Sequence, residues 1–407
     1  MSAKQTDIII SGAGAAGLTL AVLLGQAGLR VTIADPQKPP SIKDIEPSGR
    51  TVALLESSLN ILKNTGVWDD LKAVSNPLEM MRIFDDSDAS KDPIEIDFPA
   101  SDIGLAQFGY NIPNAHLRAA LFARIKKLKS VTFIQDAFSS FNIEKNDIKV
   151  EFASKKSIAG KVLIGADGRN SPVREFANIG TDVKKYDQSA ITCLINHSRA
   201  HNNVSTEFHR TNGPMALVPL PGNQSSVVWV ESQEKAEALL KLKKQEFTQA
   251  LQDKTHNVLG GITLEVGPEA WPLCSIKAKS LSAPRVALVA EAAHVMSPIT
   301  AQGLNLSLRD VAALAEEIVG AARLGLDIGS SGVLSAYAKR RNLDIETRVF
   351  GVDTMNRVVS TNALGLKRLR RAGLKSLDTL LPLKTLAMQI GLAPQLDQGR
   401  LARGEKL

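Results

Sequence analysis

The sequence is poor in cysteine and in long apolar runs, and each shortage excludes a class of protein. Only two cysteines, Cys193 and Cys274, occur in 407 residues, far apart and without metal-type spacing. This usage excludes a disulfide framework and a cysteine zinc site, and it favours a reducing, cytoplasmic location. No apolar run is long enough to span a bilayer. The first expected strand begins by Asp7, which leaves no space for a signal peptide.

Aromatic residues make up only 4% of the chain, although the formal net charge is +7. The positive charge is concentrated in residues 331–407, which hold 14 Lys and Arg against 6 Asp and Glu. Because aromatic side chains are not interleaved with these cations, we expect no nucleic-acid partner. The length predicts two or three domains around a large core.

The most informative segment is residues 7–35, which read as a strand, a glycine turn, a helix and a second strand. Gly12, Gly14 and Gly17 fill G-x-G-x-x-G: the first allows a sharp turn, the second lets a pyrophosphate approach the backbone, and the third lets the helix lie close to the strand. The N–H groups at the helix start point at the phosphates, and this start includes Ala15 and Ala16. Asp35 ends the second strand, where its carboxylate suits the ribose hydroxyls of an adenosine and would repel a 2′-phosphate. We therefore predict a nucleotide-binding βαβ unit, without choosing between NAD and FAD.

Two later segments place polar groups at strand ends. Residues 161–174 read as a buried strand followed by Asp167-Gly168 and a helix, an arrangement that suits a ligand crevice in an α/β sheet. Residues 285–310 read as a strand with Glu291 at its end, then a loop, then a long helix from about Leu304. The positive end of that helix suits the anionic edge of a reduced flavin. His294 is interpreted as a packing histidine.

The intervening segments complete the expected architecture. Residues 51–65 have helical spacing, and Arg50 before them suits pyrophosphate or a flavin edge, with a plain surface arginine as the alternative. Residues 109–121 predict a turn into a helix that carries Arg118. Residues 80–98 predict the start of a second sheet, 189–232 an antiparallel sheet, and 235–251 one surface helix.

The second sheet is expected to supply the walls of an apolar substrate pocket. Core packing is the simpler interpretation for most of the candidates, which are Phe208, Met215, Leu217, Val218 and Trp229.

The three segments together resemble the class A flavoprotein monooxygenases of the p-hydroxybenzoate hydroxylase fold. The stretches GRTVALLESSLNIL, GYNIPNAHLRAAL, GPMALVPLPG and AQGLNLSLRDVAALAE are similar to the ubiquinone-biosynthesis polyprenylphenol hydroxylase subfamily, over about residues 7–394. The resemblance implies an α/β fold with a Rossmann-like FAD-binding domain (1–75, 101–180 and 276–330), an inserted antiparallel β-sheet substrate domain (76–100 and 181–275) and a C-terminal helical region (331–407).

The resemblance also implies which residues contact FAD. No catalytic acid or base and no metal site are expected. The implied cofactor-binding residues are Gly12, Gly14, Ala15, Ala16, Gly17, Asp35, Arg50, Arg118, Asp167, Gly168, Glu291, Pro298, Gln302, Gly303, Leu304 and Asn305. One position departs from the family, which has Gly-Asp where this chain has Ala290-Glu291. The added methyl and the longer carboxylate predict a shifted ribityl contact or weaker FAD binding.

The activity implied is hydroxylation of a polyprenylphenol ring in ubiquinone biosynthesis, with dioxygen, a flavin 4a-hydroperoxide and electrons from NAD(P)H as a transient donor. Other ubiquinone-biosynthesis proteins are possible partners. Three alternatives stay open: a monooxygenase of another aromatic compound, a flavin reductase of prenyl lipids, and a non-catalytic subunit whose flavin site has decayed. A yellow protein that consumes NAD(P)H with a prenylphenol would exclude the last.

The C-terminal tail suggests a membrane contact. Its cations stand beside a run of leucines, and each cation near an anionic surface contributes about 1 kcal/mol. Peripheral binding on the inner face of the membrane and a helical cap with a solvated charged face are equal alternatives. The cluster comprises Lys367, Arg368, Arg370, Arg371 and Lys375 with Leu380, Leu381, Leu383, Leu386, Met388 and Ile390.

Overall fold

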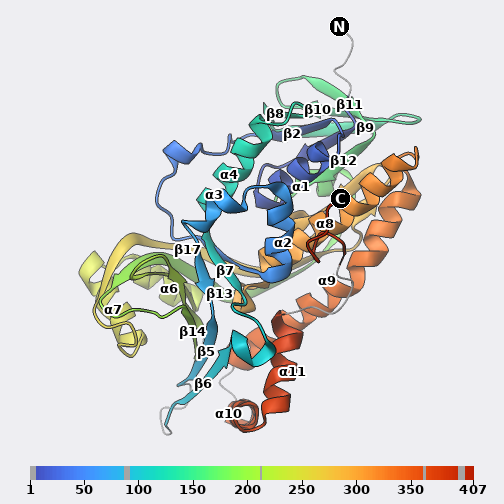
Figure 1. The fold of residues 1–407 in the computed structure, drawn as a ribbon. Helices are drawn as coiled ribbons and strands as arrows, with labels where there is room; N and C mark the ends of the chain where they lie inside the picture. Colours follow the sequence, from blue (N-terminus) through green and yellow to red (C-terminus); the bar gives the residue numbers. More distant parts are fainter. Residues whose placement is uncertain (1–5, 87–91, 211–212, 361–363, 393–398) are drawn as a thin grey trace.

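The computed structural model describes residues 6–86, 92–210, 213–360, 364–392 and 399–407. Two sheet-based parts lie side by side, and the C-terminal helices run along both of them (Figure 1).

The first part is built on a six-stranded sheet of order β18-β19-β12-β1-β2-β8. All neighbouring strands are parallel except the short β18 at the edge. The central strand is buried along its whole length, as expected for a parallel strand covered on both faces. The strands are β1 (Ile8–Ser11), β2 (Val31–Asp35), β8 (Val131–Gln135), β12 (Val162–Gly165), β18 (Ser282–Ala283) and β19 (Val286–Leu288).

Helices and a small meander cover this sheet. Helix α1 (Ala15–Gln26) is buried on nearly every side because it packs against both α4 (Asn114–Lys126) and α8 (Gln302–Arg323). The antiparallel meander consists of β9 (Phe138–Ile143), β10 (Ile148–Phe152) and β11 (Ser157–Gly160), and the short α5 (Pro172–Phe176) packs against β9 and β12.

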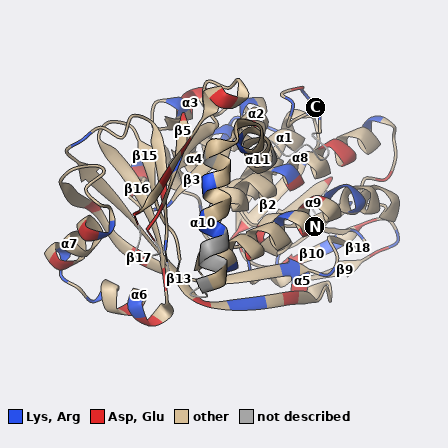
Figure 2. Ribbon diagram, turned by 90° about the horizontal axis from the view of Figure 1, so that it is seen from below, with Lys and Arg blue, Asp and Glu red and all other residues tan. Residues whose placement is uncertain are grey.

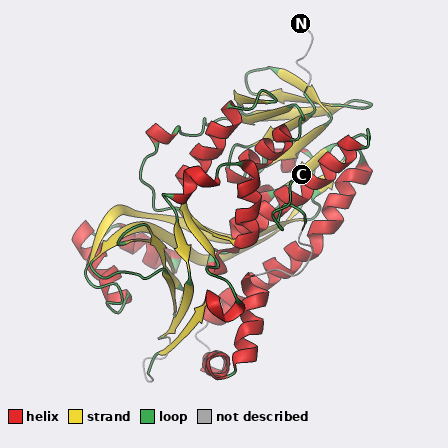
Figure 3. Ribbon diagram, viewed as in Figure 1, coloured by secondary structure: helices red, strands yellow, loops and turns green. Residues whose placement is uncertain are grey.

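The second part is an eight-stranded sheet of order β20-β17-β13-β16-β15-β14-β5-β6. Its pairs are antiparallel except that β14 and β5 run parallel. Helices α6 (Gln233–Leu240) and α7 (Lys244–Lys254) cover its outer face (Figure 3). The strands are β5 (Met80–Asp85), β6 (Ile94–Pro99), β13 (Thr181–His197), β14 (Val204–His209), β15 (Met215–Leu220), β16 (Gln224–Glu231), β17 (Ile262–Ala278) and β20 (His294–Val295).

A three-stranded sheet, β3-β7-β4, connects the two parts. Asn111 on its middle strand donates to the carbonyl of Pro219 and to the Ser226 hydroxyl of the large sheet, at 2.9 and 3.2 Å. The remaining elements of this region are β3 (Thr51–Leu55), β4 (Asn76–Leu78), β7 (Gly109–Pro113), α2 (Glu56–Thr65), α3 (Trp68–Lys72) and the 3₁₀ turns η1 (Ile42–Asp44), η2 (Ala100–Ile103), η3 (Ala290–Ala292) and η4 (Ile299–Ala301).

Three helices follow α8 in the described residues: α9 (Ser331–Ser360), α10 (Leu364–Thr379) and α11 (Leu381–Leu392). Helix α9 packs on α8 and leads to α10 and α11, which lie beside β6 and η2 (Figure 1). None of the helices in the described residues has the length and apolar character needed to cross a membrane.

The predicted fold class is confirmed, with three local corrections. Residues 51–65, predicted as one helix, form β3 and then α2, because the first five pair with β7. Residues 235–251, predicted as one helix, belong to two helices that are separated at 241–243. The second sheet is not wholly antiparallel, because β5 and β14 pair in parallel. The domain boundaries stay a prediction.

The basic tail also differs from the expected solvated cluster. Arg370 and Arg371 are buried: the Arg370 Nε donates to the fully buried carboxylate of Asp85 at 2.8 Å, and Arg371 donates to the carbonyl of Asp92 at 2.6 Å. Figure 2 shows basic residues along α10, but Arg370 and Arg371 are buried against the end of β5 and the segment just before β6. The side chains of Lys367, Arg368 and Ile390 lie outside the described part of the structure.

Candidate functional site

The predicted motifs leave neighbouring parallel strands at one edge of the six-stranded sheet. Ser11 at the end of β1 lies beside Gly165 of β12, and Gly165 lies beside Leu288 of β19. Three segments therefore begin side by side at this edge of the sheet: the glycine turn, Asp167-Gly168 and Ala290-Glu291. Ligands bind at this edge in open α/β sheets.

The three glycines of the turn have different surroundings. A Cβ added to Gly12 would lie 2.2 Å from the carbonyl oxygen of Ala166, and one added to Gly17 would lie 2.1 Å from that of Gly12. Both glycines are thus required by close backbone approach, and Gly12 also has a left-handed φ of 108°. Gly14 has an ordinary φ and no atom within 4 Å of an added Cβ. The space in front of Gly14 is open, as a pyrophosphate requires.

The start of α1 is an uncapped helix N-terminus. Gly14 is the N-cap, no side chain bonds to the first turn, and the first helical hydrogen bond runs from Leu18 to Gly14. The N–H groups of Ala15, Ala16 and Gly17 therefore precede the helical ladder, and such groups bind anions.

Asp35 is held firmly at the end of β2. Its Oδ2 accepts the Ala13 N–H at 2.7 Å, and its Oδ1 accepts the Gln37 N–H at 2.8 Å. These bonds fix the carboxylate beside the glycine turn, at the place that the ribose prediction requires.

Asp167 lies in the turn after β12, with Gly168 in the left-handed region at a φ of 85°. Its Oδ2 accepts the Val173 N–H at 3.1 Å, whereas its Oδ1 is buried without a hydrogen-bond partner in the part of the chain that the structure describes. Burial raises the pKa of this carboxyl above its ordinary value, because the neighbouring hydrogen bonds do not fully offset the lost hydration.

The backbone at position 290, where the resemblance implies glycine, is in the left-handed region. Ala290 is almost fully buried and has a φ of 58°, a left-handed conformation that costs an alanine about 1–2 kcal/mol relative to glycine. Its N–H donates to the Asp310 carboxylate at 3.1 Å. Glu291, which follows, is exposed. Residue 290 therefore has the left-handed backbone conformation although it is an alanine and not a glycine.

The start of α8 is the third part of the site. Ala301, at a φ of 52°, turns the chain into the helix, and nothing lies within 4 Å of a Cβ added to Gly303. Asn305 is fully used by backbone: its Oδ1 accepts the Leu55 N–H at 2.9 Å, and its Nδ2 donates to the Ala53 and Ala301 carbonyls at 2.8 Å each. Asn305 thus joins α8 to β3. Of the other predicted residues here, Pro298 is exposed, Leu304 half-buried and Gln302 buried.

Arg50 directly precedes β3 of the connecting sheet, and Arg118 lies on α4, which follows β7 of that sheet. The Arg50 guanidinium lies 4.9 Å from the ring centre of Trp271, which comes from β17 of the large sheet. The carbonyl of Arg50 accepts the Asn114 N–H at 3.1 Å, next to the start of α4. Arg118, one turn into α4, is half-buried, and its Nε has no hydrogen-bond partner.

Several polar atoms in these segments are buried without a partner among the described residues. An unpaired buried polar atom costs about 1–3 kcal/mol, so native proteins seldom keep several without a ligand or water. These atoms and the open space at Gly14 and Gly303 fit a long polar cofactor such as FAD. They are the Nε of Arg118, the Oδ1 of Asp167, the Oγ of Ser297 and the Oε1 of Gln302.

The predicted pocket residues divide between the two faces of the large sheet. Phe208, Met215, Leu217 and Trp229 are buried in the core beneath α6 and α7. Val218 is half-buried on the opposite face, where its strand neighbour Ser226 hydrogen-bonds Thr51 at 2.7 Å. Of the five predicted residues, only Val218 therefore lies on the face of the large sheet that meets the connecting sheet.

Sequence reasoning missed two features. Along β17, successive residues point to opposite faces of the sheet. This alternation could have identified Trp271. The second is an ionic network in which Asp310, fully buried, accepts hydrogen bonds from His294 at 2.6 Å and Arg341 at 2.8 Å. Burial alone would raise the pKa of Asp310, but the charges of His294 and Arg341 hold it below its usual range. The signal was the charged pair Arg309-Asp310 between apolar residues of α8, with Leu308 before it and Val311 to Ala315 after it.

The fold and these three segments define a flavoprotein of the FAD-dependent monooxygenase class. Residues 5–348 match the FAD binding domain family, and the chain belongs to this family.

The chain is similar to proteins with ubiquinone-related names along nearly its whole length. It is 32% identical to the ubiquinone hydroxylase UbiL of Rhodospirillum rubrum, an alignment that covers 99% of this chain and 94% of that protein. It is 29% identical to the 3-demethoxyubiquinol 3-hydroxylase of Escherichia coli, with 96% and 100% covered. Among solved structures, an HpxO variant of Klebsiella pneumoniae complexed with FAD has a TM-score of 0.76 at 17% identity, over 96% of this chain and 100% of that one.

These comparisons confirm the family recognised from the sequence, and FAD as its cofactor. The roles of the individual site residues stay predictions.

Proposed function

We propose that this protein is an FAD-dependent monooxygenase that hydroxylates the aromatic ring of a polyprenylphenol intermediate in ubiquinone biosynthesis. Dioxygen is the second substrate, and NAD(P)H supplies the electrons. The names of the Rhodospirillum and Escherichia relatives support the substrate class, and they make other ubiquinone-biosynthesis proteins candidate partners.

One observation carries the proposal: three separate segments with unpaired polar atoms lie at one edge of the parallel sheet, and a second sheet faces that edge. The contact of Arg50 with Trp271, and the Thr51–Ser226 hydrogen bond, join the two parts. A cofactor at this edge is thus enclosed between the sheets, where water can be excluded.

We assign the FAD contacts by the position of each segment. Gly14 and the N–H groups at the start of α1 bind the pyrophosphate, and Asp35 binds the ribose of the adenosine. Arg50 and Arg118 neutralise phosphate or flavin oxygens. Asp167 and Glu291 hold the ribityl chain. The start of α8, from Pro298 to Asn305, lies against the isoalloxazine with its positive helix end.

We place the substrate on the face of the large sheet that carries Val218. The same face carries Thr192 and Val228, which are half-buried, and the exposed Trp271; the Thr192 hydroxyl is buried without a hydrogen-bond partner among the described residues. These residues give an apolar wall with one hydroxyl that suits a phenol oxygen. Phe208, Met215, Leu217 and Trp229 support this wall from behind.

FAD, when bound, accepts electrons and activates dioxygen. The residues of this chain bind and orient: the apolar wall holds the ring near the flavin, and enclosure between the sheets keeps water out. The chain has one dinucleotide motif, at Gly12–Gly17, and FAD fills it. The electron donor therefore visits the site transiently.

The C-terminal hairpin, α10 with α11, is the proposed contact with a membrane. Its inner face packs on β6 and η2 through Leu374 and Met388. Four leucines at the hairpin end are 42–61% exposed, namely Leu380, Leu381, Leu383 and Leu386. The carbonyl of Gly391 on α11 accepts the Gln302 side chain at 3.3 Å, so the hairpin also reaches the start of α8. A polyprenyl chain could pass from lipid to the site along this path.

Purified protein tests the proposal directly. We expect a yellow protein whose NAD(P)H consumption increases when a prenylphenol is added, and a product heavier by one oxygen atom in mass spectrometry. A matched assay with Val218→Asp should leave FAD bound and abolish hydroxylation. A protein that binds FAD but transfers no oxygen to any prenylphenol would contradict the proposed activity.

A further inference from the structure

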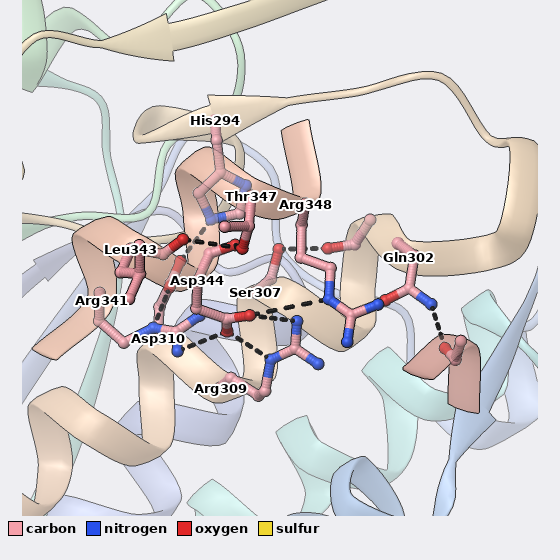
Figure 4. A network of polar contacts seen from close by, with 12 residues as sticks. His294, Gln302, Ser307, Arg309, Asp310, Arg341, Leu343, Asp344, Thr347 and Arg348 are labelled. Carbon is pink, nitrogen blue, oxygen red and sulfur yellow. Dashed lines mark hydrogen bonds and ion pairs between the residues drawn. The ribbon is translucent and has the colours of Figure 1, made fainter. Parts of the chain in front are cut away.

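A network of buried charges lies directly beneath the turn that joins β19 to β20 (Figure 4). Asp310 on α8 is at its centre, and its Oδ1 accepts the Nε of Arg341 at 2.8 Å. Arg341 on α9 continues the network to Asp344, at 2.7 Å, and Arg309 lies 2.9 Å from the same carboxylate. None of these side chains belongs to the proposed FAD contacts.

The second oxygen of Asp310 accepts hydrogen bonds from both ends of one short segment. Its Oδ2 accepts the Ala290 N–H at 3.1 Å and the His294 Nε2 at 2.6 Å. Glu291 lies between these two residues. The Asp310 carboxylate therefore holds both ends of the turn that contains Glu291.

Ala290 needs such a restraint more than a glycine would. Its left-handed φ of 58° is disfavoured for any residue with a Cβ. The N–H bond to Asp310 and the Leu288 carbonyl, which accepts the Tyr337 hydroxyl at 2.8 Å, both stabilise this backbone conformation from the helical side. A chain without glycine at this position therefore depends on its buried neighbours.

We infer that Asp310 is a positioning residue for FAD: it holds residues 290–294 in the strained turn that presents Glu291 to the cofactor. Asp310 itself does not touch FAD. The inference rests on the proposed placement of Glu291 beside the ribityl chain.

The first test measures FAD affinity of the apo-protein after removal of each network carboxylate. Asp310→Ala removes the acceptor for the turn and should raise the FAD dissociation constant at least tenfold. Asp344→Ala is the matched control, because Asp344 binds the same Arg341 and is also buried, but its hydrogen bonds and ion pairs in the described part of the structure go to α8 and α9 and not to residues 290–294. We expect it to change the dissociation constant less than threefold. Asp310→Asn serves as a milder variant if the alanine variant does not fold.

The second test is a rescue by glycine. Ala290→Gly alone should change FAD affinity less than threefold, since glycine adopts the left-handed conformation without strain. Combined with Asp310→Ala it should restore most of the lost affinity. Hydrogen exchange of apo-protein peptides covering residues 289–295 should be faster in Asp310→Ala and unchanged in Asp344→Ala.

The outcomes separate this inference from the proposed site. Equal loss of FAD affinity in both alanine variants, or no rescue by glycine, would overturn the positioning role and leave a purely structural one. Glu291→Ala tests the site itself: if it leaves FAD affinity unchanged while Gly14→Ala lowers it, the placement of Glu291 is wrong and the inference fails with it.

Discussion

At the scale of single residues, the glycine motif separates packing from binding. A methyl at Gly17 would lie 2.1 Å from a backbone oxygen, whereas a methyl at Gly14 meets no atom within 4 Å. Gly14→Ala should therefore leave the apo-protein as stable as the parent or about 0.4–1 kcal/mol more stable, because alanine lowers the entropy of the unfolded chain. It should still weaken FAD binding at least tenfold, since the methyl occupies the space for pyrophosphate. Urea unfolding and FAD titration measure the two effects.

Gly17→Ala is the contrasting variant. Its methyl clashes with backbone in the absence of any cofactor, and we expect apo-protein stability to fall together with FAD affinity. If Gly14→Ala destabilised the apo-protein as much as Gly17→Ala, the space at Gly14 would have a structural role instead.

Asp167 gives a pH-dependent prediction. Burial raises its folded-state pKa, so the ionised carboxylate weakens the apo-protein. The wild type keeps its full stability below the unfolded-state value of about 3.9 and loses part of it as the pH rises through the folded-state pKa. Asp167→Asn, which keeps an oxygen for the Val173 N–H, should be more stable than wild type at pH 7 and equal to it near pH 4. Thermal unfolding of both apo-proteins across this range checks the sign; a constant difference at every pH would contradict it.

At this scale, the sequence predicted interactions between residues that are close along the chain and missed those between distant residues. The roles of Gly12 and Gly17 are local to one βαβ unit, and their close approaches are present as predicted. The contact of Arg50 with Trp271 joins residues more than 200 positions apart, and the burial of Asp310 depends on Arg341 from another helix. No periodicity in one sequence links such pairs, because only the packing of the elements brings them together.

At the scale of elements, the same limit explains the wrong helix at residues 51–65. The spacing of its apolar residues fits a helix, but residues 51–55 pair with β7 in an antiparallel ladder instead. The Asn305 side chain then adds bonds to the Ala53 carbonyl and the Leu55 N–H. Tertiary contacts therefore decide between strand and helix here.

Asn305→Ala should test that connection between α8 and β3. It leaves a buried N–H and a buried carbonyl without partners, and each costs about 1–3 kcal/mol. We expect a loss of about 2–6 kcal/mol in unfolding free energy from denaturant titration. Ser307→Ala is the control, because Ser307 is buried on the same helix but bonds only to Gly303 within it. Similar losses in the two variants would show that Asn305 does not join the elements.

At the scale of the whole molecule, the C-terminal helices are tied to the large sheet by a buried ion pair. Arg370 is 8% exposed, Asp85 is fully buried, and Arg370 also donates to the carbonyls of Val358 and Val359 at 2.8 Å each. Arg370→Gln would break the ion pair between Arg370 and the buried Asp85 carboxylate, and breaking a buried pair by removing one partner costs about 3–5 kcal/mol. The expected result is a lower denaturation midpoint and faster proteolysis of α10 and α11. Lys375 is an exposed cation of the same helix, so Lys375→Gln should change neither the denaturation midpoint nor the rate of proteolysis. An equal effect of the two substitutions would mean that the Arg370–Asp85 ion pair does not stabilise the hairpin.

The leucines of the hairpin end give the corresponding prediction for lipid binding. Serine in place of Leu381, Leu383 and Leu386 should reduce cosedimentation with anionic vesicles about a hundredfold, if each leucine contributes about 1 kcal/mol by burial in lipid. Leu324 and Leu326, which are 76% and 57% exposed between α8 and α9, provide the control. Serine at those two positions should leave vesicle binding unchanged. Because Arg370 and Arg371 face inward, most of the affinity should come from the leucines, and neutral vesicles should retain a substantial part of it. Full loss of binding on neutral vesicles, with no effect of the leucine substitutions, would mean that exposed cations alone make the contact.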